Sequence, residues 1–159
     1  MTDKSVFSTV EWDQLLRLPW WVVDAASAVQ SDGALGTAAE KEVGLLSISW
    51  GRDSGNAFVA DIAEQLTYAE AAEQDEVGGP NFTDVSAGIA DVLDRCRDVS
   101  RLLGEKADQR DAAAYRAWLI SISEKVTAAA RSGGVFGLRT SVTEVERQFT
   151  EDLSNALKI

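Results

Sequence analysis

The chain of 159 residues contains no histidine and only one cysteine, and these two absences exclude most common catalytic and metal centres. Without histidine there can be no histidine-based catalytic triad, no imidazole proton relay and no zinc site with histidine ligands. One cysteine cannot form an internal disulfide, a CxxC redox pair or an all-cysteine zinc site. Catalysis would have to use carboxylates, lysine, tyrosine or serine, and no motif specifies such a centre. We therefore expect a protein that is not an enzyme.

Long apolar runs are also missing. The longest strongly apolar run, residues 20–23, is interrupted by Asp24, whereas a helix needs roughly 20 apolar residues to span a bilayer. The first residues contain none of the apolar core that a secretory signal requires, and a single cysteine is typical of a reducing compartment. We therefore expect a cytoplasmic protein without membrane insertion.

Basic residues are scarce relative to acidic ones. The chain has 26 aspartates and glutamates against 15 lysines and arginines, which gives a net charge of −11 and an isoelectric point near 4.4. A surface of this charge repels a phosphate backbone. We therefore expect no nucleic acid among the partners.

Proline is rare as well, with only Pro19 and Pro80 present, and apolar residues recur with the helical period along almost all of the chain. No segment shows a convincing strand pattern. The pattern predicts six helices, with a break or a new first turn at Pro19; they lie at about residues 11–30, 37–51, 56–72, 84–103, 111–132 and 141–157. We expect a single all-α domain, packed as a compact bundle or an orthogonal helical array.

The predicted helix starts rest on side chains that cap helices in proteins. These candidate caps are Thr37, Asn56, Thr83 or Asp84, Asp111 and Ser141, and the fourth helix is expected to end at Gly104. Apolar spacing predicts which side chains are buried. The second helix is expected to bury Val43, Leu46 and Trp50, and the last helix Val142, Val145, Phe149, Leu153 and Leu157.

One common core is predicted for the last three helices. We expect Trp118, Ile122, Phe149 and Leu153 to be buried together, with Cys96 facing the same interior as a small apolar residue.

A short pattern occurs twice and predicts an internal repeat. Residues 31–36 (SDGALG) are echoed by residues 132–137 (SGGVFG), and each copy is followed by a capping-box pattern, at residues 37–40 and 141–144. The pattern predicts two helical hairpins, at about residues 20–50 and 112–157, linked by helices at about 56–72 and 84–103. Matched turns and caps normally reflect matched backbone paths, so we expect an approximate two-fold between the hairpins.

Carboxylates gather around the first glycine turn. Asp32 and Glu40, with Glu42 close by, are candidate ligands for a hard cation such as calcium, because a glycine turn lets oxygens converge. The alternative is structural: Asp32 stabilises the turn, and Glu40 completes a capping box and complements the helix dipole. The second copy has Gly133 where the first has Asp32, so a symmetric pair of metal sites is not encoded.

Two adjacent tryptophans, Trp20 and Trp21, cannot both point into one core from the same helix. Either both wedge between helices as large anchors, or at least one forms part of a surface for a partner or ligand. These two residues are the sequence's candidate interaction surface.

The stretch Ala25-Ala26-Ser27-Ala28-Val29-Gln30-Ser31-Asp32-Gly33, followed by Glu40-Lys41-Glu42, resembles an element of the TerB-like tellurite-resistance family. The resemblance implies a compact, acidic, cytoplasmic, all-helical protein with internal pseudo-symmetry. It also implies a role in stress responses and carboxylates suspected of holding a metal ion, at Asp32 and Glu40.

Two functional hypotheses follow. The first is a non-enzymatic helical interaction module, which works through a surface that binds a protein partner or a second copy of itself. The alternative is a helical protein that binds a cation or a small ligand with clustered carboxylates.

Overall fold

The protein is described here by a computed structural model of residues 1–29, 38–69, 79–132 and 142–158. In these ranges it is all-α, as predicted, and no strand occurs in them. The six α-helices are α1 (Thr9–Ala28), α2 (Ala38–Ser49), α3 (Ala57–Ala69), α4 (Val85–Lys106), α5 (Gln109–Ser132) and α6 (Glu144–Ala156); two short 3-10 helices are η1 (Lys4–Val6) and η2 (Trp50–Asp53). Within the same ranges, no helix has the length and apolar character needed to cross a membrane.

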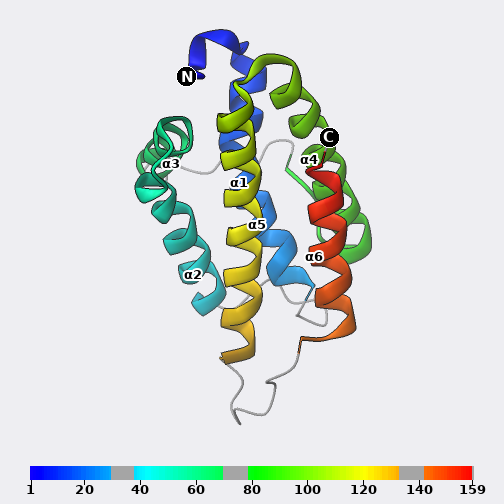
Figure 1. Ribbon diagram of the computed structural model, residues 1–159. Coiled ribbons are helices and arrows are strands. Elements are labelled where there is room, and N and C mark those ends of the chain that lie inside the picture. Colours follow the sequence, from blue (N-terminus) through cyan, green and yellow to red (C-terminus); the bar gives the residue numbers. More distant parts are fainter. Residues whose placement is uncertain (30–37, 70–78, 133–141, 159) are drawn as a thin grey trace.

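Helix α5 is the central element, because it packs against every other α-helix. In the view of Figure 1, α2 and α3 lie on one side of α5, α4 and α6 lie on the other, and α1 lies behind it. The sequence of α5 suits this position, since its buried side chains recur at helical spacing and point to several neighbours. They are Asp111, Ala112, Tyr115, Trp118, Leu119, Ile122, Ser123, Val126 and Thr127.

The predicted core is confirmed. Trp118, Ile122, Phe149 and Leu153 belong to one buried cluster, and Cys96 lies in the same cluster with no exposed surface. A chain of ring contacts extends this core toward the N-terminus and links five aromatic side chains: Phe7, Trp12, Phe58, Tyr115 and Trp118.

The predicted break at Pro19 is wrong, because α1 continues through this residue. Proline has no N–H, so inside a helix it leaves the carbonyl of the residue four positions earlier without its usual donor. That carbonyl belongs to Leu15, and it accepts a hydrogen bond from the hydroxyl of Tyr115 on α5, at 2.7 Å. The tertiary hydrogen bond replaces the missing helical one, which explains how the helix tolerates a buried proline.

The predicted caps are confirmed for two helices. The Asn56 side chain accepts a hydrogen bond from the Val59 N–H at the start of α3 (3.1 Å), and Asp84 accepts one from the Ala87 N–H in α4 (3.1 Å). Helix α4 continues past Gly104 to Lys106, so its predicted end is two residues too early. Thr37 lies outside the described residues.

Asp111 does not cap α5, contrary to the prediction. The helix begins at Gln109, and the Asp108 side chain accepts from the Arg110 N–H at its start. Asp111 lies in the first turn, where its carboxylate accepts the Thr2 N–H at 2.6 Å and the Asn56 side-chain N–H at 2.8 Å. Asp111 therefore ties the N-terminal segment and the start of α3 to α5.

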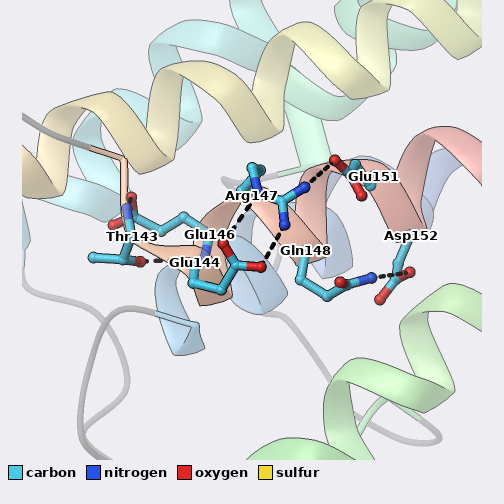
Figure 2. Close-up of polar contacts among 7 residues, drawn as sticks. All are labelled: Thr143, Glu144, Glu146, Arg147, Gln148, Glu151 and Asp152. Atoms are coloured by element: carbon cyan, nitrogen blue, oxygen red, sulfur yellow. Dashed lines mark hydrogen bonds and ion pairs between the residues drawn. The ribbon is translucent and has the colours of Figure 1, made fainter.

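The start of α6 is also shifted from the prediction. The N-cap is Thr143, and Thr143 and Glu146 form the capping box. Glu144 instead pairs with Arg147, which also pairs with Glu151 along the outer face of α6 (Figure 2). Ser141 lies outside the described residues, and Val142 and Val145, which were predicted to be buried, are exposed.

The two glycine turns of the predicted repeat, including Gly36 and Gly137, lie outside the described residues. Within these residues, α1 packs against α2 and α5 packs against α6. The two-fold relation between these helix pairs stays a prediction.

Candidate interaction surface

Helix α2 and the following η2 bury small residues. Gly44, Ser47, Ile48 and Gly51 recur at steps of three, one and three residues and are all buried, so they form one helical stripe. Three of the four have little or no side chain. This face lies against α1 and α5.

The glycines allow an unusually close approach to these neighbours. A Cβ atom added to Gly44 would lie 2.5 Å from Val23 Cγ1, and one added to Gly51 would lie 2.8 Å from the Trp118 ring. Neither position has room for a methyl group without movement of its neighbours. The contact of α2 with α1 and α5 therefore depends on small residues.

Two large apolar residues of this segment face the opposite way, whereas Ile48 is buried. Leu46 is 46% exposed and Trp50 is 50% exposed, and Val43, one turn before Leu46, is half-buried. The predicted burial of Leu46 and Trp50 is therefore wrong. The prediction used apolar spacing, which marks the face with the largest side chains, whereas the glycines determine which face meets the bundle.

Two cations are close to this exposed stripe, Lys125 in space and Arg52 in sequence. The Lys125 ammonium of α5 lies 4.4 Å from the centre of the Trp50 ring and donates a hydrogen bond to Ser121 Oγ at 2.9 Å. Arg52, two residues after Trp50, donates from Nε to the Ser49 carbonyl oxygen. We call the group formed by Val43, Leu46, Trp50, Arg52 and Lys125 the Trp50 surface.

Some cations of the described residues form ion pairs and others do not, and the unpaired ones include Lys4, Lys41, Arg110, Arg116 and Lys158. Among the described residues, neither Arg52 nor Lys125 forms an ion pair. The cations that do pair are Arg17, Arg95, Arg97, Arg101, Lys106 and Arg147. Exposed carboxylates occur in the same segments, at Glu42, Asp53 and Glu124, but none of these is in ion-pair contact with the two cations.

The tryptophans predicted to form an interaction surface, Trp20 and Trp21, are each partly buried and pack against the core. The Arg95 guanidinium covers the Trp21 ring at 4.4 Å from its centre. Such a contact stabilises a partly exposed ring by about 0.5–1 kcal/mol. Their role in binding a partner stays a prediction. Among the described residues, no ring contact joins either of them to Trp50.

Only one of the two residues of the predicted cation site lies within the described residues. Glu40 lies in the first turn of α2 and is 7% exposed, whereas Asp32 lies outside the described residues. Among the described residues, no three acidic or cysteine side chains are grouped as a metal ion would need. Calcium binding by Asp32 and Glu40 therefore stays a prediction.

Two other features, a hollow beside α5 and the Cys96 thiol, have structural roles and are not candidate sites. A hollow of about 340 Å³ lies beside the start of α5, lined by Asn56, Asp108 and Asp111 among others, but both Asp111 oxygens already accept hydrogen bonds. Burial raises the pKa of the Cys96 thiol to about 12, so this thiol is protonated at neutral pH and is a poor nucleophile.

No family model, no curated protein and no solved structure gives a significant match to this chain. The resemblance to the TerB-like family therefore stays an expectation. The residues of the Trp50 surface were not identified from the sequence, although one signal was present: Gly44, Ser47 and Gly51 repeat at helical spacing, which is typical of closely packed helices.

Proposed function

We propose that this chain is a helical interaction module that binds a protein partner through the Trp50 surface. One observation carries the proposal: the segment of α2 and η2 buries Gly44 and Gly51 against the bundle and leaves about half of the surface of Leu46 and Trp50 exposed. Folding alone favours the reverse arrangement, because burial of a leucine contributes about 1.5–3 kcal/mol to stability. An exposed leucine and tryptophan on one helix face are typical of residues that are buried on association.

The rigidity of this surface supports the proposal. The close contacts of Gly44 and Gly51 fix α2 against the bundle, and Lys125 holds one side of the Trp50 ring. A rigid aromatic anchor loses little conformational entropy when it binds, which increases affinity. The single, buried cysteine is consistent with action in the cytoplasm, and the role in stress responses rests on the resemblance to the TerB-like family.

Site-specific photo-crosslinking in cells tests this function. A photoreactive phenylalanine analogue in place of Leu46 is expected to give a discrete adduct with another protein, and the adduct is expected to disappear in the Trp50→Ala background. The matched control places the same analogue at Arg97, an exposed position on α4, which is expected to give no discrete adduct.

Equal labelling from both positions, or an adduct that survives Trp50→Ala, would contradict the proposal. An adduct of twice the chain's mass would mean that the surface binds a second copy of the chain instead of a different protein.

A further inference from the structure

We infer that the segment bound by the Trp50 surface carries a carboxylate beside an apolar side chain, an inference that rests on the proposed function. The apolar part would cover Leu46 and Trp50, and the carboxylate would pair with Lys125 and Arg52. The position of the two cations next to Trp50, in space for Lys125 and in sequence for Arg52, is the feature that specifies the chemistry of the partner.

Lys125 is held in place but keeps capacity to donate. Its ammonium has three donors, and among the described residues it donates one hydrogen bond, to Ser121 Oγ. The indole ring attracts the ammonium through its π face, but it does not accept a hydrogen bond as a carboxylate oxygen does. Because the ammonium lies over the ring, 4.4 Å from its centre, a carboxylate of a segment that packs beside Trp50 can reach the remaining donors.

Arg52 is in a comparable state. Its Nε donates to the Ser49 carbonyl oxygen at 3.2 Å, which orients the guanidinium and leaves its terminal N–H groups without an ion-pair partner among the described residues. In this protein, which has a net charge of −11, a carboxylate of the same chain pairs with some of the cations, as at Arg95 and Arg101. Lys125 lies over the exposed Trp50 ring and Arg52 follows Trp50 by two residues, and neither has such a partner among the described residues, so a carboxylate of a bound segment can pair with them.

The net charge distinguishes a short acidic segment from larger anions. A nucleic acid or an anionic bilayer presents many charges at once and is repelled by the whole protein. A segment with one or two carboxylates interacts mainly with charges within about 8–10 Å, because salt screens more distant ones; these charges include Arg52 and Lys125 and also Asp53 and Glu124, their sequence neighbours.

The size of the surface indicates a short segment. Val43 and Trp50 are seven residues apart in sequence, and a helical rise of about 1.5 Å per residue places them roughly 10 Å apart along the axis. This length matches about two turns of a partner helix. Peptides of about 15 residues are therefore long enough to cover the surface.

Selection from a random library of such peptides, displayed on phage and panned against the full chain, tests the inference. The recovered peptides are expected to combine apolar residues with aspartate or glutamate, and to lose binding on Trp50→Ala. For a recovered peptide, Lys125→Glu is expected to weaken binding about tenfold or more. Lys125→Met serves as a second variant, since it removes the charge and keeps an unbranched side chain.

The matched control is Lys158→Glu, which changes the net charge by the same amount at an exposed position beyond α6 and is expected to change affinity less than about twofold. Peptides that bind Trp50→Ala as well as the wild type, or no recovered peptide, would overturn the proposed function together with the inference. Peptides that require Trp50 but are neutral or basic, with affinities unchanged by Lys125→Glu, would overturn the inference alone. Trp50-dependent binding to phosphatidylglycerol vesicles would also overturn it, since the ligand would then be a lipid.

Discussion

The hydroxyl of Tyr115 donates a hydrogen bond to the carbonyl of Leu15, the carbonyl that Pro19 leaves without a helical donor. The three residues come from two helices, and Tyr115 is fully buried. Burial disfavours the phenolate and raises the pKa of Tyr115 well above 10, so the hydroxyl remains a donor at all ordinary pH values. A buried proline in α1 and a buried tyrosine in α5 therefore act as one unit.

We expect Tyr115→Phe to lower the free energy of unfolding by about 1–3 kcal/mol, because the buried Leu15 carbonyl loses its donor. In the Pro19→Ala background the same substitution is expected to be less costly, since the N–H of the alanine can bond to that carbonyl. Urea denaturation of the four variants gives the coupling energy. An equal cost of Tyr115→Phe in both backgrounds would show that the two residues do not act together.

The contact between Gly51 and Trp118 leads to a second prediction. A methyl group at Gly51 would overlap the indole ring, so Gly51→Ala is expected to destabilise the protein by about 1–3 kcal/mol. Gly104, an exposed glycine within α4, is the matched control, and Gly104→Ala is expected to stabilise by about 0.5–1 kcal/mol. Thermal unfolding of both variants measures the difference. A neutral Gly51→Ala would mean that α2 has room to move away from α5.

The sequence was sufficient to predict the helices and much of the core. The apolar lines of α4 and α5 are long and regular, and Cys96, Trp118 and Ile122 lie where their spacing placed them. Local cap chemistry was also sufficient at Asn56 and Asp84, because the side chain and the N–H that it accepts from are three residues apart.

The sequence was insufficient wherever the decisive contact is distant. Asp111 accepts from Thr2, 109 residues earlier in the chain, and no local pattern indicates that pairing. The donor that supports Pro19 comes from Tyr115, on another helix. The orientation of α2 depends on the absence of side chains at Gly44 and Gly51, and a hydrophobic pattern gives no weight to an absent side chain.

Asp111 leads to a prediction on pH dependence. Its burial raises the pKa, but hydrogen bonds from Thr2 and Asn56 outweigh this effect and hold the pKa below 3.8. Because the folded pKa is lowered, these bonds stabilise the protein above the usual aspartate pKa, and this contribution is lost as the pH falls through the folded value.

We therefore expect Asp111→Asn to lower the free energy of unfolding by about 1–3 kcal/mol at pH 7, and the difference from the wild type to shrink below about pH 4. Urea titrations at a series of pH values measure it. Asp53→Asn, at an exposed position, is the control and should show neither effect. A difference that is independent of pH would assign the stabilisation to packing instead of to the charged carboxylate.

Calcium distinguishes the two functional hypotheses. A cation that binds the folded state at Asp32 and Glu40 would raise the melting temperature. We expect millimolar calcium to have little effect, since Glu40 has a capping role available and the second copy of the repeat has Gly133 in place of Asp32. A rise of several degrees that is lost on Asp32→Asn and not reproduced by sodium chloride at matched ionic strength would favour the cation-binding alternative.

Leu46 and Ile48 provide an internal comparison for the two faces of α2. Ile48 is 1% exposed and Leu46 is 46% exposed, although they are separated by one residue. We expect Ile48→Ala to lower the free energy of unfolding by about 2–5 kcal/mol, because it leaves a cavity in the core. Leu46→Ala is expected to change it by less than about 1 kcal/mol, because the side chain keeps much of its contact with water in the folded protein.

Denaturation at several protein concentrations also tests whether a second copy of the chain covers Leu46 in solution. If Leu46→Ala is as costly as Ile48→Ala, and its cost increases with protein concentration, then Leu46 is covered in solution by a second copy of the chain. If the cost is small at every concentration, the free protein leaves this leucine uncovered. The proposed function requires this second outcome, because Leu46 must be uncovered in the free protein if a different protein is to bind it.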